Sequence, residues 1–338
     1  MPSNTDYQHA ADVLSAAERV LITTHIRPDG DACGCMRALA DHLAAAGKQV
    51  RPLVLSPMAA WYADLFDEPV PVLDNDIKPD ALGQVYGDCD LMVIVDTNSL
   101  TQLPGLEAFI TQARAAGRPT ILVIDHHITG DDLGDVQLLD TQAAAAGEIV
   151  FDLFKAAGWP ITQRIAEAIF IAVATDTGWF KYGNADSRIF HTAAELVGIG
   201  VHPEAVYRRL YQSFSPARLA LMTRMLEHLS LHAAGRIAVQ HILRRDFDET
   251  GATGADTENL IDECQRIATV DVAVLLVELS DGRFRCSLRS KNAVDVRAIA
   301  QAYGGGGHTL AAGVTLDGPL DVAKQRLLAD IQKQLAVQ

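Results

Sequence analysis

Short, almost continuous apolar runs recur in the first part of the chain and alternate with stretches of helical periodicity. Runs of this length, ended by polar residues, glycine or proline, are typical of buried strands. They occupy 20–24, 49–55, 90–95 and 120–124. Apolar residues at helical spacing predict helices over 34–46, 106–116, 141–157 and 162–174. Apolar strands alternating with helices predict an α/β fold, in which a parallel sheet carries helices on both faces.

The segment 57–86 interrupts this alternation, because it holds several prolines. We expect one short helix near 61–66 and otherwise a loop. Further along, 191–230 reads as a helical connection. In it, Ser215 supplies an N-cap and Pro216 the first residue of a helix.

The last third of the chain predicts a second, smaller α/β domain. Its strands are expected at 236–243, 270–279 and 282–289, and its helices at 258–268, 294–303 and from 321 onward. The chain of 338 residues is long for one core. We therefore expect an N-terminal domain over 1–190, a helical linker over 191–230 and a C-terminal domain over 231–338.

The composition of the chain excludes some classes of binding partner. The formal net charge of −15 argues against a protein that grips long duplex nucleic acid through a broad basic face, but it leaves small anionic substrates open. No apolar run is long enough to span a bilayer, and the N-terminus shows no signal peptide, so no membrane partner is expected. The five cysteines are odd in number and scattered. Reduced thiols and a cytoplasmic location are the expectation.

Three of the apolar strands end in acidic or imidazole side chains. His25, Asp29 and Asp31 follow the first strand, Asp96 ends the one at 90–95, and the run at 120–124 leads into Asp125, His126 and His127. The carboxyl ends of parallel strands share one edge of the sheet, so these side chains are expected to converge. Asp176, after the apolar segment 162–174, is a natural addition. Taken singly, each residue could instead be a helix cap or a paired histidine.

Several carboxylates in one crevice repel each other strongly unless cations neutralise them. Imidazoles and carboxylates in this number suit two divalent ions that share a carboxylate, for which Asp96 is our choice. Such a pair hydrolyses phosphate esters well. Asp125 could orient His126 without binding metal, and His127 could contact the phosphate or donate a proton.

A second group of candidates lies in the C-terminal domain. Strand alternation in 283–291 places Phe284, Cys286 and Leu288 on one face and basic residues on the other. The basic residues are Arg283, Arg285, Arg289 and Lys291. A glycine run, Gly304, Gly305, Gly306 and Gly307, then precedes His308. Glycines let backbone N–H groups approach a phosphate closely, although a solvated strand face and a flexible turn would look similar.

These motifs resemble a known family. His25, Asp29 and Asp31, the strand-end Asp96, the triplet Asp125-His126-His127 and Asp176 resemble the four motifs of the DHH phosphoesterase superfamily. Arg289-Ser290-Lys291 with the glycine run and His308 resembles the accompanying DHHA1 domain. Size and domain pair are most similar to the NrnA-like oligoribonuclease and 3′-phosphoadenosine-5′-phosphate (pAp) phosphatase subgroup.

The resemblance implies two Mn²⁺ ions in a cleft between the domains, with Mg²⁺ or Co²⁺ as alternatives. The positions matching one ion's ligands are His25, Asp29 and Asp96. Those matching the other's are Asp31, Asp96, His126 and Asp176. His127, Arg289 and His308 match positions associated with substrate. Members of the family are commonly dimers, so a homodimer is expected.

The motifs and the resemblance lead to two hypotheses for the enzymatic activity. The first is a Mn²⁺-dependent phosphohydrolase that degrades short RNA to mononucleotides and pAp to AMP, through a hydroxide bridging two metals. The alternative is a phosphodiesterase acting on cyclic or linear dinucleotides such as c-di-AMP or pApA. Pyrophosphatase and exopolyphosphatase activities fit the glycine loop less well, and the length and charge disfavour a processive RecJ-type exonuclease. A catalytically silent nucleotide sensor would lack metal ligands, and no ligand position is substituted here.

Overall fold

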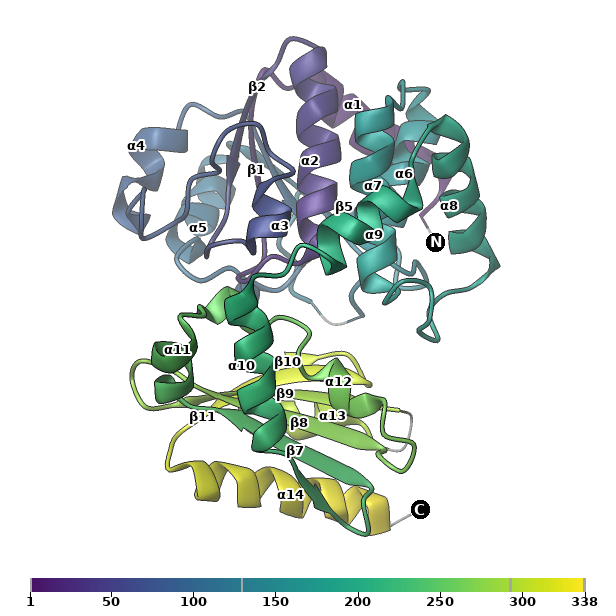
Figure 1. The fold of residues 1–338 in the computed structure, drawn as a ribbon. Coiled ribbons are helices and arrows are strands. Elements are labelled where there is room, and N and C mark those ends of the chain that lie inside the picture. The colour runs from purple at the N-terminus through teal and green to yellow at the C-terminus, as the bar shows by residue number, and fades with distance from the viewer. Residues whose placement is uncertain (1, 129, 292–293, 337–338) are drawn as a thin grey trace. The chain divides into compact units, whose positions relative to one another are not determined.

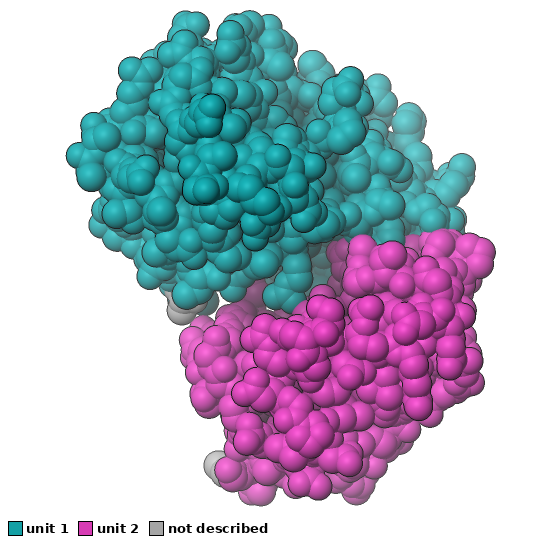
Figure 2. All heavy atoms as spheres, turned by 90° about the vertical axis from the view of Figure 1, so that its left-hand side faces the viewer, with its two compact units in different colours: residues 1–213 teal, residues 214–338 magenta. Residues whose placement is uncertain are grey.

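The computed structural model describes residues 2–128, 130–291 and 294–336. Its contacts divide the chain into two compact units, residues 1–213 and 214–338, coloured separately in Figure 2. The stretch expected to connect the domains, 191–230, contains this boundary. Helices α8 (Ser187–Ile199) and α9 (Pro203–Tyr211) belong to the first unit, and α10 (Pro216–Glu227) belongs to the second.

The first unit is built on a sheet of five parallel strands in the order β2-β1-β3-β4-β5. The strands are β1 (Arg19–Thr24), β2 (Gln49–Leu53), β3 (Leu91–Val95), β4 (Thr120–Asp125) and β5 (Val136–Leu139). All five residues of β3 are buried, because a central parallel strand is covered on both faces. The predicted parallel α/β sheet is therefore confirmed.

Helices cover both faces of this sheet (Figure 1). On one face, α4 (Leu82–Tyr86) and α5 (Glu107–Ala116) share a core with apolar residues of β1, β3 and β4. The helices α1, α2, α6 and α7 lie on the other side in Figure 1, and α2 contacts β1, β2 and β3. Their bounds are α1 Asn4–Ala16, α2 Gly30–Ala45, α6 Ala146–Ala157 and α7 Gln163–Asp176. The short α3 (Ala60–Ala63) lies in the segment expected to hold one short helix.

Several element bounds differ from the sequence expectation. Helix α2 begins at Gly30 rather than at 34, because the Asp29 side chain accepts hydrogen bonds from the N–H groups of Asp31 and Ala32 and caps it. Helix α6 begins at Ala146 rather than at 141, since the residues before it form a turn. The short strand β5 and helix α4 were not predicted.

Two glycines let α7 pack closely against its neighbours: Gly34 in α2 and Gly147 in α6. A Cβ at Gly34 would clash with the carbonyl oxygen of Ala168 in α7, and a Cβ at Gly147 would lie 2.5 Å from the Cβ of Ala172. Only glycine permits such contacts between neighbouring helices. The close packing holds the start of α2, with Asp31, beside the end of α7, with Asp176.

The second unit contains a mixed sheet of six strands in the order β10-β11-β9-β8-β7-β6, in which only the β7–β8 pair is parallel. Its strands are β6 (Ser230–His232), β7 (Ile237–Ile242), β8 (Val272–Glu278), β9 (Phe284–Ser290), β10 (Gly306–Gly307) and β11 (Ala311–Leu316). Its helices, besides α10, are α11 (Arg244–Thr250), α12 (Asp262–Gln265), α13 (Val296–Gln301) and α14 (Leu320–Ala336).

The two faces of this sheet have separate cores. Phe284, Cys286 and Leu288 pack with residues of α13 and α14, which confirms the predicted alternation in β9. The opposite face packs against α10, α11 and α12. The helix expected over 258–268 is shorter than predicted, because Asn259 adopts a positive φ of 57° between a 3₁₀ turn and α12. No helix among the described residues is both long and apolar enough to cross a membrane.

A stacked histidine pair in the second unit predicts how stability depends on pH. The rings of His228 and His241 lie 4.1 Å apart and almost parallel. Burial, and then the charges of His228 and Lys324, lower the pKa of His241 from 6.5 to about 4, although Asp246 opposes this. The unfolded chain therefore binds a proton first as the pH falls from 6.5 toward 4, and the folded state loses stability in that window.

We expect His241 to lower the free energy of unfolding at pH 4.5 by about 1–2 kcal/mol, because solvent screens the charge at the half-buried ring. Urea unfolding of the His241→Gln variant at pH 7.5 and 4.5 should therefore show a smaller loss than in the unmodified protein. The exposed His191→Gln variant is the control. Equal losses in unmodified protein and His241→Gln would contradict this account.

Candidate metal centre

The order of the strands creates the site. Strand β1 is followed in the chain by its neighbour β2 on one side, and β3 then lies on the other side of β1. A crevice forms where the order reverses, at the carboxyl ends of β1 and β3, and ligands of open α/β sheets bind there. His25 directly follows β1, Asp96 follows β3, and His126 follows β4.

His25, Asp29 and Asp96 form the first group that could hold an ion, with one ligand atom from each lying within 4.8 Å of the others. The Nε2 atom of His25 lies 3.3 Å from Asp96 Oδ2, and its Nδ1 lies 2.9 Å from the Ile26 carbonyl oxygen. If Nδ1–H donates to that carbonyl, Nε2 keeps its lone pair for a metal. Asp29 caps α2 with Oδ1, so its Oδ2 is left to bind a metal.

Asp31, Asp96 and His126 form the second group. The Nε2 atom of His126 lies 3.5 Å from Asp96 Oδ1, 3.9 Å from Asp31 Oδ2 and 3.8 Å from Asp176 Oδ2. The other ring nitrogen, Nδ1, lies 3.2 Å from the carbonyl oxygen of Ala143. The structure thus brings all six candidate ligands together, with Asp176 reaching the cluster from the last residue of α7.

Asp96 lies between the two groups. Its Oδ2 faces His25 and its Oδ1 faces His126, so one carboxylate could bind two ions at once. The side chain is almost fully buried, and Oδ1 accepts no well-formed hydrogen bond from the described residues, with His126 Nε2 the near neighbour at 3.5 Å. Its backbone adopts a positive φ of 60°, which aspartate tolerates better than most residues and which is common at functional sites. These features fit a divalent cation.

Asp31 is held by the start of helix α6. Its Oδ2 accepts the N–H of Ala146 at 2.6 Å and its Oδ1 accepts that of Gly147 at 2.8 Å. The first turn of a helix favours negative charge, because its N–H groups are unpaired and the helix dipole points there. The carboxylate therefore closes the N-terminus of α6 and faces His126 with the same oxygen that accepts from Ala146.

The buried carboxylates of the cluster repel one another, and bound cations would relieve this repulsion. Burial, followed by neighbouring carboxylates, raises the pKa of Asp29 and of Asp31, and raises that of Asp176 to about 7. Burial disfavours protonation of His25, but its hydrogen bond to Asp96 and the charge of Asp29 outweigh this and raise its pKa to about 9. Without metal, the cluster holds protons that two divalent ions would replace, and metal binding would release them.

Asp125 contacts a different histidine from the one suggested by the sequence. Its Oδ1 lies 2.7 Å from His127 Nδ1, while His126 is oriented by Ala143. Side chains two positions apart along an extended chain point to the same side, so Asp125, the last residue of β4, meets His127 and not its direct neighbour. Asp125 is fully buried and His127 is partly exposed, at 30% of its side chain. The pair resembles a carboxylate that orients an imidazole for contact with substrate.

The basic candidates of the second unit are partly engaged. Arg283 pairs with Asp281 in the turn before β9, and Arg289 Nε lies 3.7 Å from Asp262 Oδ1. Lys291 Nζ donates to the carbonyl of Ile267 at 2.8 Å, and Arg285 donates to Thr257. Arg289 Nη1 also donates to the carbonyl oxygen of Leu288 at 3.2 Å, so each of these basic side chains has a partner within the second unit.

The glycine run comprises strand β10 and the two residues that precede it. A Cβ at Gly305 would clash with the carbonyl oxygen of Gly313, and Gly307 has a φ of 134° with the Ala311 carbonyl oxygen 2.5 Å from the position of a Cβ. Gly306, by contrast, has open space where a side chain would lie. Gly304 has a positive φ of 79°, so the fold explains three of the four glycines and gives no reason for Gly306. His308 continues the hairpin through paired backbone bonds with Ala311.

Backbone groups are the functional contributors that the sequence did not reveal. The carbonyls of Ile26 and Ala143 and the N–H groups of Ala146 and Gly147 orient His25, His126 and Asp31. An alanine run carries no side-chain signal for such a role. A correctly placed start of helix α6 would have indicated that the free N–H groups near Gly147 can bind a carboxylate.

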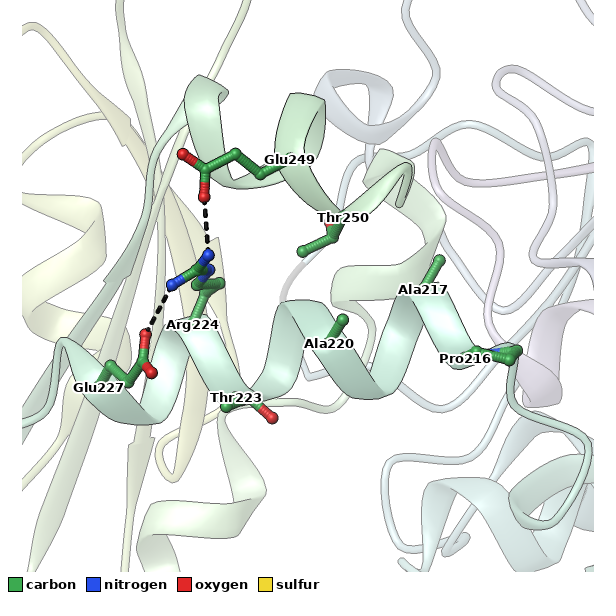
Figure 3. A pocket seen from close by; sticks show the side chains of 8 residues that line it. All are labelled: Pro216, Ala217, Ala220, Thr223, Arg224, Glu227, Glu249 and Thr250. Carbon is green, nitrogen blue, oxygen red and sulfur yellow. Dashed lines mark hydrogen bonds and ion pairs between the residues drawn. The ribbon is translucent and has the colours of Figure 1, made fainter.

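A separate groove in the second unit lies between α10 and α11 (Figure 3). In it Arg224 pairs with Glu227 and Glu249, at 3.1 and 2.9 Å. None of the candidate substrate or metal residues lines this groove. Its charges are already paired with each other, so we assign it no chemistry.

Comparison with known proteins identifies the family of the chain. Residues 19–173 match the N-terminal domain of the DHH family, and residues 234–336 match the DHHA1 domain. The chain is 31% identical over 336 residues to the bifunctional oligoribonuclease and PAP phosphatase NrnA of Thermus thermophilus, which covers 96% of this chain and 93% of the relative. It is 25% identical over 322 residues to the NrnA of Bacillus subtilis, with coverages of 94% and 95%.

A crystal structure of an exopolyphosphatase-related protein from Bacteroides fragilis shares the fold, with a TM-score of 0.89 at 22% identity over 99% of this chain and 98% of that one. Both domain families match in order, and a relative above 30% identity matches along nearly its whole length. The chain therefore belongs to the DHH–DHHA1 phosphoesterases, in the NrnA-like subgroup, and is an enzyme.

Proposed function

We propose that this protein is a Mn²⁺-dependent phosphohydrolase that degrades short RNA to mononucleotides and dephosphorylates pAp to AMP. The observation that carries the proposal is the position of Asp96, whose two oxygens face two separate groups of histidine and carboxylate. When bound, two divalent ions would lower the pKa of a water, orient the phosphoryl group and neutralise the leaving oxygen.

The residues of the chain would act as follows. His25 and Asp29 would hold one ion, and Asp31, His126 and Asp176 the other, with Asp96 shared. His127, oriented by Asp125, would contact the phosphate or donate the proton that the leaving oxygen needs. Mn²⁺ suits this set because its ligands are hard carboxylate oxygens together with imidazoles.

The choice of substrate rests on the relatives and on the second unit. Two relatives named as oligoribonuclease and PAP phosphatase match along almost their full length. The net charge of −15 disfavours long nucleic acids, so a small anion held by a few cationic groups is the better fit. Arg283, Arg289, Lys291 and the loop 305–308 are our proposed substrate ligands. A homodimer and a cytoplasmic location remain predictions.

A glycine pair tests the substrate role of the loop. A Cβ at Gly306 would enter open space, so we expect Gly306→Ala to fold normally but to raise the KM for pAp about tenfold, because the methyl group keeps phosphate from the backbone. The matched variant Gly305→Ala should instead lower the thermal denaturation midpoint, since its methyl group meets Gly313 and Val314. An unchanged KM in Gly306→Ala would remove this loop from the substrate site.

A product panel tests the proposed reaction. Metal-free protein is supplied with Mn²⁺ and, separately, with pAp, an RNA dinucleotide, a five-nucleotide RNA and cyclic di-AMP. We expect AMP from pAp and mononucleotides from both RNAs, with no turnover when a chelator is present. Consumption of cyclic di-AMP alone would show that the alternative, a cyclic-dinucleotide phosphodiesterase, is correct.

A further inference from the structure

A buried ionic cluster lies next to the second group of metal candidates. Arg188, from the first turn of α8, contacts three carboxylates: Asp140 at 2.9 Å, Glu148 at 3.1 Å and Asp152 at 2.8 Å. The side chains of Asp140 and Glu148 are 0% and 1% exposed. Such carboxylates need a counter-charge, and Arg188 supplies it.

The carboxylates held by Arg188 shape the turn formed by residues 140–147. Asp140 Oδ1 accepts the N–H of Gln142 at 3.0 Å, and Glu148 Oε2 accepts the N–H of Ala144 at 2.8 Å. The Asp140 carbonyl also accepts the N–H of Ala143. The conformation of the turn therefore depends on two buried carboxylates whose positions depend on one guanidinium.

The same turn contacts two of the candidate ligands directly and is linked to the backbone of a third. The carbonyl of Ala143 binds the His126 ring, and the N–H groups at the end of the turn bind Asp31. Asn184 links the turn to the third ligand, because its amide donates to the carbonyl of Ala144 at 3.0 Å and to that of Asp176 at 3.3 Å.

The first group does not depend on this turn. His25 is oriented by Ile26, and Asp29 by the start of α2. Among the described residues, no hydrogen bond links either side chain to the turn. A disturbance of the turn should therefore affect one ion far more than the other.

We propose that Arg188 is a positioning residue for one of the two metal ions: through Asp140 and Glu148 it fixes the 140–147 turn, which aims His126 and Asp31 at that ion. This inference rests on the two-ion centre of the proposed function. Among the described residues, the partners of the Arg188 guanidinium are Asp140, Glu148 and Asp152, none of which is a candidate metal ligand. Its guanidinium geometry matters, since it reaches three carboxylates from separate nitrogen atoms.

Mn²⁺ titration of metal-free protein tests this role, with free Mn²⁺ followed by its electron paramagnetic resonance signal. In Arg188→Met we expect one of the two dissociation constants to rise about tenfold or more and the other to stay within about twofold, as for loss of groups that orient metal ligands. Arg188→Lys should show a smaller weakening of the same site.

The matched control is Arg37→Met. Arg37 is a buried arginine of the first unit and pairs with two carboxylates, Asp41 at 2.8 Å and Asp67 at 3.2 Å; among the described residues, no hydrogen bond or ion pair joins it to the turn. Both dissociation constants should stay within about twofold of the unmodified protein, whatever the loss of thermal stability. Circular dichroism confirms that each variant is folded.

Equal weakening of both sites in Arg188→Met, or no weakening, would overturn the inference. If Arg188→Met does not fold, Arg188→Lys is tested instead, because one ammonium group cannot contact all three carboxylates at once. Mn²⁺ affinities of Arg188→Lys equal to those of the unmodified protein would then refute the role of Arg188. Fewer than two ions in the unmodified protein would refute the two-ion centre itself, and the inference with it.

Discussion

Replacing Asp96 with asparagine is expected to lower the turnover of pAp and of short RNA by on the order of 10³-fold or more. Asparagine keeps the shape of the side chain but loses the charge and one of the two oxygens. Those oxygens face His25 and His126 at 3.3 and 3.5 Å, so no other residue can replace the shared carboxylate. Initial rates of AMP release at saturating Mn²⁺ measure the effect.

His126→Ala should cause a loss of similar size, whereas the exposed Asp80→Asn variant should behave as the unmodified protein. Unfolding of the metal-free proteins must be measured alongside, because Asp96 is buried. Hydrolysis unchanged in both Asp96→Asn and His126→Ala would rule out the two-ion mechanism.

Replacing His127 with glutamine is the change with the next largest expected effect. We expect kcat to fall about 10²- to 10⁴-fold, the usual contribution of a group that transfers a proton. Binding of both Mn²⁺ ions should persist, because the two ligand groups and Asp176 together supply the ligands of both ions without His127. Rates and Mn²⁺ binding are measured on the same preparation.

The partner variant Asp125→Asn should lower kcat less than His127→Gln does, since an amide can still accept the hydrogen bond from the ring. The exposed His202→Gln variant is the control. Loss of an ion in His127→Gln would instead make this histidine a metal ligand, and the assigned role would be wrong.

The strands and their ends were predictable because the pattern is strong there. The runs that became β1, β3 and β4 are mostly apolar, and a parallel sheet brings their carboxyl ends to one edge whatever the loops do. Asp96 and His126 could therefore be placed near each other from the sequence. The edge strand β5 was missed, since it is short and only partly buried.

The details around the ligands depend on tertiary contacts. Alanines 143–146 favour a helix by their intrinsic propensity, yet Asp140 and Glu148 hold the residues before Ala146 in a turn. The pairing of His127 with Asp125 depends on the backbone path of residues 126 and 127, which lie outside regular secondary structure. Neither feature has a signal in the local sequence, and the role of Arg188 follows only from the same contacts.

The central claim is that Asp96 joins two metal ions, and one measurement tests it most directly. Electron paramagnetic resonance of the protein loaded with two equivalents of Mn²⁺ should show the multiline signal of an exchange-coupled pair, which Asp96→Asn should lose. That is the result the account predicts. A signal from a single ion, or from two uncoupled ions in the unmodified protein, would contradict it.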